Sequence, residues 1–352
     1  MNIKRIQSAL PLRCAALIEC PHNRRYLTGF VSSYGSLLIT RDSAVLLTDS
    51  RYIEAARAAI SCCAVEELKA GHLNALCKAH SVKKLWLEST ATLEQAQQLR
   101  NALPGVYVTA GRVLDAQLKQ LRMIKSSDEV EKIRAAQRIA EAAFAQVLPT
   151  IAAGMTEREI ALELDFAMLR GGAEQLAFDT IVAAGMNGSK PHAVPGNYAL
   201  QPGDLITMDF GAVVKGYHSD MTRTVVLGKP SARAKEIYEL VLAAQLAALD
   251  TIAPGVACKE VDAAAREVIK AAGYGEHFRH GTGHGLGLEV HEEPRLSAKS
   301  HDVLRPGMVV TVEPGVYLPG ELGVRIEDLV VITDTGFENL TACNKMLVAC
   351  EP

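Results

Sequence analysis

Short apolar runs alternate with amphipathic stretches along roughly the first 120 residues of the chain. The apolar runs have the composition of buried β-strands, and they read AALIE, SLLIT, AVLLT and KLWLE. The stretches YIEAARAAI and TLEQAQQLRNAL instead show the spacing of amphipathic helices. This alternation predicts an α/β domain.

A long alanine-rich helix is expected to open within LRMIKSSDEVEKIRAAQ, a charged segment that starts at Leu121. Ser126 and Glu129 have the spacing of a capping box, which marks the start of a helix. Because 352 residues exceed what most single cores organise, we expect two domains and place the boundary directly before this segment. The predicted domains are residues 1–121 and 122–352.

The second part contains an internal repeat. TIAAGMTEREI, from Thr150, resembles TIAPGVACKEV, from Thr251, and QPGDLITMDFG resembles RPGMVVTVEPG further on. Each of the latter segments ends an apolar strand with one carboxylate, Asp209 or Glu313. The matches together predict a duplicated half-domain of helices followed by strands.

Composition narrows the class of protein. An apolar content of 49% with 22% charged residues is ordinary for a soluble globular enzyme, and a net charge of -3 gives no reason to expect nucleic acid or an anionic membrane as partner. No apolar run approaches the roughly 18 residues of a membrane span. The eight cysteines form no C-x-x-C pair, which favours reduced thiols in a cytoplasmic protein.

The stretch HGTGHGLGLEVHEEP, residues 280–294, carries three histidines among closely spaced glycines. Glycine disfavours a helix by about 1 kcal/mol relative to alanine, so we expect a strand or loop. On a regular strand His280 and His284 would share one face and His291 the other, so the chain must bend if all three meet. We expect the glycines to let this backbone approach the substrate.

Two aspartates lie on a predicted hairpin formed by LITMDFG and GYHSDMTRTVVL. A turn at residues 214–215 would place Asp209 directly opposite Asp220, whereas a turn at 215–216 would leave the two diagonal. Both registers put the two carboxylates on one face, where like charges are destabilising without a cation between them.

Two further carboxylates, Glu313 and Glu327, lie in otherwise apolar strands, where burial alone would be costly. With Asp209, Asp220 and one histidine they make a set of four carboxylates and one imidazole. Four negative charges are balanced by two divalent cations. Oxygen-rich ligation of this kind favours Mn²⁺, with Co²⁺ or Zn²⁺ as alternatives.

Three further residues have different expected roles. Asp328 points to the opposite strand face from Glu327 and is expected to be structural. Arg325 shares the face of Glu327 and could orient that carboxylate, hold substrate or form a structural salt bridge. His192, in KPHAVPGN, lies in a loop and gains interest only from the residues above.

Five segments in order resemble the metallopeptidases with the pita-bread fold, and the resemblance covers roughly residues 121–347. The segments are FDTIVAAGMNGSKPHAVPGN, TMDFGAVVKGYHSDMTRT, HGTGHGLGLEVHEEP, TVEPGVYLPG and GVRIED. The N-terminal part resembles that of the prolidase and aminopeptidase P branch, which methionine aminopeptidases lack. Creatinase shares both domains but not the metal ligands. The resemblance implies an α/β N-terminal creatinase-like domain followed by an α+β pita-bread domain with a pseudo-twofold duplication.

The resemblance also implies roles for single residues. The metal ligands would be Asp209, Asp220, His284, Glu313 and Glu327, with Asp220 and Glu327 bridging two ions. Substrate and the developing tetrahedral centre would contact His192, His280 and His291, and Arg325 matches the arginine beside the last ligand. Glu313 is the expected proton shuttle. A homodimer is a further expectation from the resemblance.

The implied substrates are Xaa-Pro dipeptides or short peptides with proline second. We favour the dipeptidase slightly over the aminopeptidase. A dipeptide's carboxylate could be bound by Arg295 or by Arg51, but a solvated surface role is the favoured interpretation for each. Methionine aminopeptidase activity and a non-catalytic binding protein on the same fold are the other hypotheses.

Overall fold

The computed structural model describes residues 2–351. The chain divides into two compact units, Met1–Arg122 and Met123–Pro352. Within residues 2–351, no helix is both long and apolar enough to cross a bilayer.

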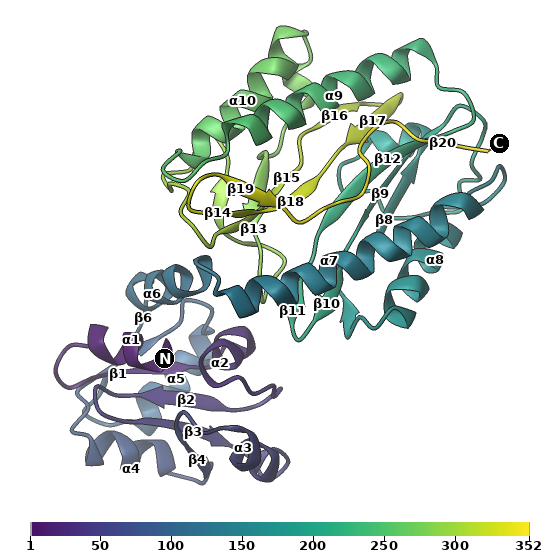
Figure 1. The fold of residues 1–352 in the computed structure, drawn as a ribbon. Coiled ribbons are helices and arrows are strands. Elements are labelled where there is room, and N and C mark those ends of the chain that lie inside the picture. The colour runs from purple at the N-terminus through teal and green to yellow at the C-terminus, as the bar shows by residue number, and fades with distance from the viewer. Residues whose placement is uncertain (1, 352) are drawn as a thin grey trace. The chain divides into compact units, whose positions relative to one another are not determined.

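The N-terminal unit is built on one mixed six-stranded sheet with the order β4-β3-β2-β1-β5-β6 (purple to blue in Figure 1). Strands β1, β5 and β6 are mutually parallel, and β2 runs antiparallel to β1. The strands are β1 Cys14–Ile18, β2 Ser36–Ile39, β3 Ala44–Thr48, β4 Ala64–Glu67, β5 Lys84–Leu87 and β6 Tyr107–Ala110. The helices are α1 Asn2–Ala9, α2 Pro21–Thr28, α3 Ile53–Ala59, α4 His72–Ala79, α5 Leu93–Ala102 and α6 Arg112–Met123.

Both faces of this sheet are buried, as the apolar runs indicated. Along β1, Ala16 and Ile18 belong to one apolar core, whereas Ala15 and Leu17 belong to a second core. Successive side chains of a strand point to opposite faces, so the sheet separates two cores that helices cover. The predicted α/β class of this unit is confirmed.

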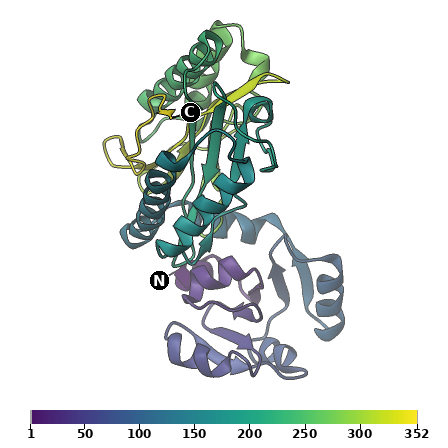
Figure 2. The same cartoon turned by 90° about the vertical axis from the view of Figure 1, so that its right-hand side faces the viewer.

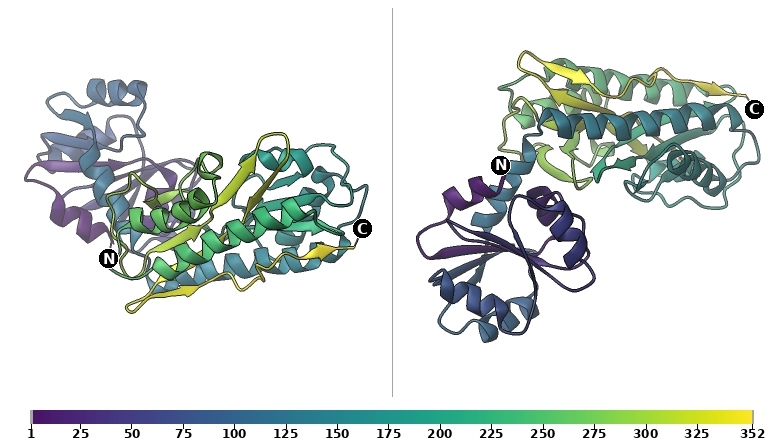
Figure 3. Two further views of the ribbon diagram at one scale, coloured as in Figure 1. Left: turned by 90° about the horizontal axis from the view of Figure 1, so that it is seen from above. Right: turned by 60° about the horizontal axis from the view of Figure 1, so that its bottom comes forward.

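The C-terminal unit consists of two halves with the same order of elements. Helices α7 Ser127–Val147 and α8 Glu157–Arg170 precede the strands of the first half. Helices α9 Ala232–Thr251 and α10 Cys258–Ala271 precede those of the second. The two helix pairs lie on opposite sides of the strands (Figures 1 and 2), and α7 and α9 are the longest helices (Figure 3). The start of α7 confirms the expected capping box, because Ser126 Oγ accepts from Glu129 N.

Each half has its own sheet and its own apolar core. The first sheet has the order β20-β12-β9-β8, and its strands are β8 Ile181–Ala184, β9 Leu205–Phe210, β12 Met221–Leu227 and β20 Ala349–Cys350. The second has the order β14-β13-β15-β18-β19, and its strands are β13 Gly283–Gly285, β14 Glu292–Leu296, β15 Val309–Val312, β18 Asp328–Ile332 and β19 Phe337–Asn339. The remaining strands are β7 Gln175–Leu176, β10 Ala212–Val214, β11 Tyr217–His218, β16 Gly315–Leu318 and β17 Leu322–Arg325.

Equivalent hydrogen bonds repeat in the two halves. Gly154 N donates to Leu200 O, and Gly255 N donates to Leu304 O. Both glycines are left-handed, with φ of 86° and 91°. The same left-handed glycine turn and the same backbone hydrogen bond thus recur about 100 residues apart. This recurrence confirms the predicted duplication.

The structure also decides between the two hairpin registers. Asp209 pairs with Thr222 across β9 and β12, so the turn lies at Lys215 and Gly216. Both turn residues have positive φ, 47° and 76°, as the tight two-residue turn of a hairpin requires. Asp209 and Asp220 are therefore diagonal on one face.

Candidate metal centre

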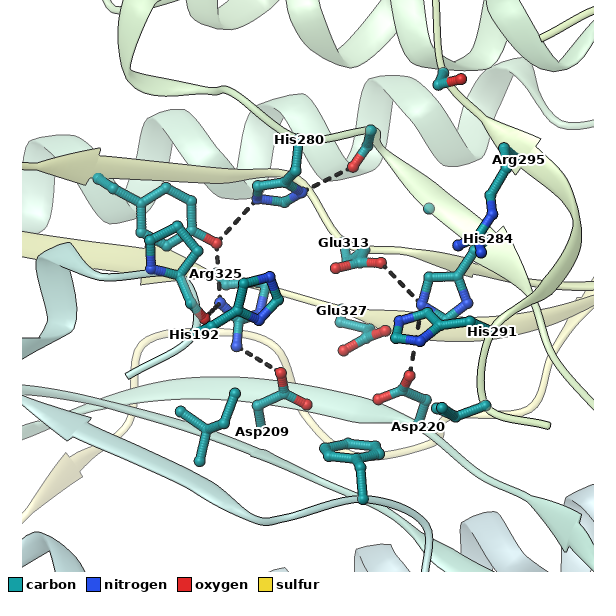
Figure 4. Close-up of a pocket in the computed structure, with 18 of the residues that line it drawn as sticks. His192, Asp209, Asp220, His280, His284, His291, Arg295, Glu313, Arg325 and Glu327 are labelled. Atoms are coloured by element: carbon teal, nitrogen blue, oxygen red, sulfur yellow. Dashed lines mark hydrogen bonds and ion pairs between the residues drawn. The ribbon is translucent and has the colours of Figure 1, made fainter. Parts of the chain in front are cut away.

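Five residues that the sequence singled out lie together between the two halves of the C-terminal unit (Figure 4). Asp209 comes from β9, and Asp220 directly precedes β12. In the second half Glu313 directly follows β15, Glu327 directly precedes β18, and His284 lies in β13. Each half thus has one pair of antiparallel strands. One carboxylate lies at the end of the first strand of the pair, and the other lies just before the second strand. The set of four carboxylates and one imidazole forms because the duplicated halves face each other.

The ligand atoms are close enough to share metal ions. His284 Nε2 lies 3.3 Å from Glu313 Oε1 and 3.7 Å from Asp220 Oδ2. Donor atoms of Asp220, His284 and Glu327 all lie within 4.8 Å of one another, and these three residues are buried. Oxygen donors with one imidazole suit divalent cations such as Mn²⁺.

Two buried carboxylate oxygens in this group have no hydrogen-bond partner among residues 2–351. They are Asp209 Oδ1 and Glu327 Oε1. The second oxygen of each is held: Arg325 Nη2 donates to Asp209 Oδ2 at 2.6 Å, and Thr222 Oγ1 donates to Glu327 Oε2 at 2.7 Å. A buried unpaired carboxylate oxygen costs free energy unless a cation is its partner, so the donor set fits divalent metal ions.

The electrostatics of the group favour added positive charge. Burial, and then the neighbouring carboxylates, raise the pKa of Asp220 and of Glu327 well above their usual values. Burial also raises the pKa of Glu313 to about 7. Burial and the neighbouring His291 lower the pKa of His284 to about 3, which keeps its imidazole neutral. A neutral imidazole can ligate a metal.

Arg325 is a buried residue that joins four parts of the site. Besides Asp209, its guanidinium donates to Tyr317 Oη at 2.9 Å, to Thr222 Oγ1 at 3.0 Å and to Pro191 O at 3.2 Å. Burial alone would lower the pKa of Arg325, but Tyr317 and Asp209 outweigh it and hold that pKa well above its usual value. The geometry therefore favours an orienting role over direct substrate binding, but the carboxylate that Arg325 contacts is Asp209 and not the expected Glu327.

His280 is engaged at both ring nitrogens. Its Nδ1 lies 2.8 Å from the carbonyl oxygen of Gly281, so Nδ1 carries the proton and donates. Its Nε2 lies 3.0 Å from Tyr317 Oη. Burial, and then Arg325, lower the pKa of His280 to about 4, so Nε2 is an acceptor for the Tyr317 hydroxyl. His280 and Arg325 thus fix Tyr317 from two sides.

His291 and His192 line the same cavity and are exposed. The ladder of β13 and β14 shifts register after His284, and the chain turns back before His291. As a result the His284 and His291 rings lie 4.5 Å apart between centroids. On a regular strand these two side chains would point to opposite faces, so the predicted bend between them is confirmed.

The glycines of this segment allow strands to pack closely, and Gly281 and Gly283 also line the cavity, so the expectation that this backbone approaches a substrate stays a prediction. A Cβ at Gly283 would lie 1.9 Å from Thr311 O, and a Cβ at Gly285 would lie 2.3 Å from Glu293 O. Both obstacles are backbone atoms of the neighbouring segments. Glycine is needed here so that β13 can lie between β14 and β15.

Several residues of the site were missed at the level of sequence. Tyr317 is fully engaged with His280 and Arg325, while Thr222 and Thr311 hold the carboxylates of Glu327 and Glu313. The only local signal is that each threonine lies two residues from a proposed ligand, Asp220 or Glu313. At that spacing a side chain shares the ligand's face of the strand. Asp328, expected to be structural, is fully buried and is held by Arg223, Lys345, Gln245 and Asn339.

The cavity that these residues line has a volume of about 470 Å³. Arg295 lines it from β14, directly across from His284, so both side chains stand on one face of the sheet. Arg295 itself is exposed. The volume falls within the range of small-molecule sites.

Family models match both parts of the chain. Residues 131–334 match metallopeptidase family M24, and residues 14–124 match the creatinase/prolidase N-terminal domain. The chain is 39% identical over 336 residues to the Xaa-Pro dipeptidase of Pyrococcus horikoshii, which covers 95% of this chain and 94% of that protein. The protein belongs to metallopeptidase family M24, whose members use divalent metal ions.

Solved structures share the whole fold. The Xaa-Pro dipeptidase from Bacillus anthracis superposes with a TM-score of 0.95 at 38% identity, covering 99% of each chain. An X-Pro aminopeptidase from Thermotoga maritima has a TM-score of 0.91 at 37% identity, covering 98% of this chain and 99% of that one. These matches confirm the predicted fold of a creatinase-type N-terminal domain followed by a pita-bread domain.

Proposed function

We propose that this protein is a dinuclear-metal Xaa-Pro dipeptidase. The observation that carries the proposal is one cavity that combines the four carboxylates and His284 with an exposed arginine, Arg295. The names of its relatives support the substrate class, since both a dipeptidase and an aminopeptidase for proline peptides share its fold.

Two Mn²⁺ ions per subunit are the proposed cofactor, held by Asp209, Asp220, His284, Glu313 and Glu327. The bridging ligands would be Asp220 and Glu327, the most deeply buried of the carboxylates. When bound, two divalent cations lower the pKa of a water and polarise the scissile carbonyl. Four carboxylates and two such cations leave no net charge in the buried group.

Glu313 is the proposed proton shuttle. Its carboxylate lines the cavity beside the other proposed ligands, where it could take up a proton from the nucleophile. Thr311 Oγ1 lies 3.1 Å from Glu313 Oε1 and fixes the orientation of the carboxylate. The proton taken up by Glu313 would pass to the nitrogen of the leaving proline.

His192 and His291 are proposed to donate hydrogen bonds to the oxygen on which negative charge develops. Both rings line the cavity and are accessible to a substrate. Donors aimed at that oxygen stabilise the transition state more than the ground state. For His280, whose nitrogens are both engaged, we propose that it acts through Tyr317.

Arg295 is proposed to bind the free carboxylate of a dipeptide. It stands across from His284 on the same face of the sheet and lines the cavity that the proposed ligands share. A bidentate pair between guanidinium and carboxylate would discriminate against peptides that continue past proline. The second candidate function is an Xaa-Pro aminopeptidase. In that enzyme the residues that follow proline would occupy the place of the dipeptide's carboxylate.

The test is the rate of cleavage of three substrates by protein loaded with Mn²⁺. Met-Pro should be cleaved faster than Met-Pro-Ala, and Met-Ala should be the poorest. Faster cleavage of Met-Pro-Ala would establish the aminopeptidase, and preferred cleavage of Met-Ala would favour the methionine aminopeptidase hypothesis. No cleavage of any peptide would leave a binding protein. Homodimeric assembly and a cytoplasmic location stay predictions, and the mass of the protein in solution tests the first.

A further inference from the structure

Two exposed charged side chains line the cavity. They are Asp179 and Arg295. The other charged side chains of the lining are buried or half-buried among the proposed ligands and Arg325. Since the proposed ions neutralise the buried carboxylates, Asp179 and Arg295 are the charges that a substrate side chain would meet.

The backbone around Asp179 fixes its direction. Thr180 is buried, and its hydroxyl lies 2.5 Å from Asp165 Oδ1 of α8. Asp179 and Ile181 flank Thr180 and both line the cavity. Among residues 2–351 no cation pairs with the Asp179 carboxylate, and its charge helps to raise the pKa of the neighbouring Asp165.

Asp179 and Arg295 belong to opposite sides of the metal centre. Ile181, two residues from Asp179, pairs with Asp209 across β8 and β9. Arg295 pairs instead with His284 across β13 and β14. In Figure 4 Asp209 and Arg295 lie on opposite sides of Glu327. A dipeptide whose carboxylate binds Arg295 therefore directs its N-terminal residue toward Asp179.

We propose that Asp179 selects the N-terminal residue of the substrate by charge, favouring cationic over anionic side chains. This inference rests on the proposed dipeptidase function. Phe178 and Ile181 beside it offer apolar contact to the stem of a long side chain such as lysine. An N-terminal glutamate would instead place a second carboxylate against Asp179.

The experiment compares dipeptides of matched shape on the Mn²⁺-loaded enzyme. The ratio of kcat/KM for Glu-Pro to Gln-Pro isolates negative charge, and the ratio for Lys-Pro to Met-Pro isolates positive charge. We expect Glu-Pro to be about threefold to tenfold poorer than Gln-Pro, as unit charges about 5 Å apart in a wet site would give. Asp179→Asn should bring the ratio close to one, and Asp179→Lys should invert it.

The matched control is Glu163→Gln, which removes an exposed carboxylate of α8 that does not line the cavity. This variant should leave both ratios as in the wild type. A Glu-Pro to Gln-Pro ratio that stays the same in Asp179→Asn would overturn the inference, as would an equal loss on every dipeptide. If the wild-type enzyme cleaves Gln-Pro, either result contradicts only the role of Asp179 and leaves the proposed dipeptidase function standing. If the wild-type enzyme cleaves no dipeptide, the proposed function itself is wrong.

Discussion

Arg325 and Asp209 come from opposite halves of the C-terminal unit and meet in a buried ion pair, with Arg325 Nη2 2.6 Å from Asp209 Oδ2. The pair leaves Asp209 Oδ1 free to face a cation. The same guanidinium fixes Tyr317, so one residue orients both a proposed ligand and the hydroxyl beside His280.

Replacing Arg325 should lower both the stability of the protein and its affinity for metal. Arg325→Met leaves Asp209 and Tyr317 without their donor, and breaking a buried pair in this way costs about 3–5 kcal/mol. Denaturant unfolding of the metal-free variant measures the loss, and metal titration should show weaker binding. Arg233→Met, which breaks an exposed pair with Glu321, is the control and should change neither. An Arg325→Met protein with wild-type stability would show that the pair does not hold the two halves.

Glu313→Gln tests the proton shuttle. The amide keeps the shape of the side chain but cannot take up the proton, so kcat should fall by about 10²-fold or more. Because the residue is also a proposed ligand, metal content is measured on the same sample. Wild-type turnover in this variant would remove Glu313 from the mechanism.

The metal-free protein should become less stable as pH rises from 6.5 to 8. Folding raises the pKa of Glu313 to about 7, and that of Asp220 and Glu327 well above the usual value. The folded state therefore binds these protons more tightly than the unfolded chain does, and that advantage is lost as pH rises through the folded pKa values. The pKa values of His280 and His284 are lowered by folding, so these histidines change the stability only below about pH 6.5.

Thermal unfolding at several pH values measures this trend. Saturating Mn²⁺ should flatten the slope, because bound cations replace the protons. Asp220→Asn should reduce the slope in the metal-free protein. A melting temperature that is constant or rises over this interval would contradict the clustering of carboxylates.

Arg295→Met should affect dipeptides more than longer peptides. Loss of a charged hydrogen bond to the substrate carboxylate should lower kcat/KM for Met-Pro by about tenfold or more. The rate on Met-Pro amide, which lacks that carboxylate, should change far less. Arg279→Met, an exposed arginine outside the cavity, serves as control. Equal losses on both substrates would argue against carboxylate recognition.

Local patterns predicted much of the fold. Ser126 and Glu129 marked the start of α7 because a capping box involves only neighbours in sequence. The duplication was visible because both halves use the same glycine turns, at Gly154 and Gly255. The hairpin register was not decided in advance, because it depends on whether Lys215 accepts a left-handed conformation.

The network around the site could not be predicted in the same way. Tyr317 contacts His280 across 37 residues, and Thr222 contacts Glu327 across 105 residues. No periodicity links such positions. The close approach of Gly283 to Thr311 O of β15 could not be predicted for a related reason, since no local pattern reveals which strands pair.

The most direct test of the central claim is a titration of metal-free protein with Mn²⁺, following the release of proline from Met-Pro and the bound metal together. We predict that cleavage is absent without metal, rises with added Mn²⁺ and saturates when two ions are bound per subunit. Proline release by protein shown to contain no metal, or saturation of cleavage with a single ion bound per subunit, would contradict the proposed dinuclear dipeptidase.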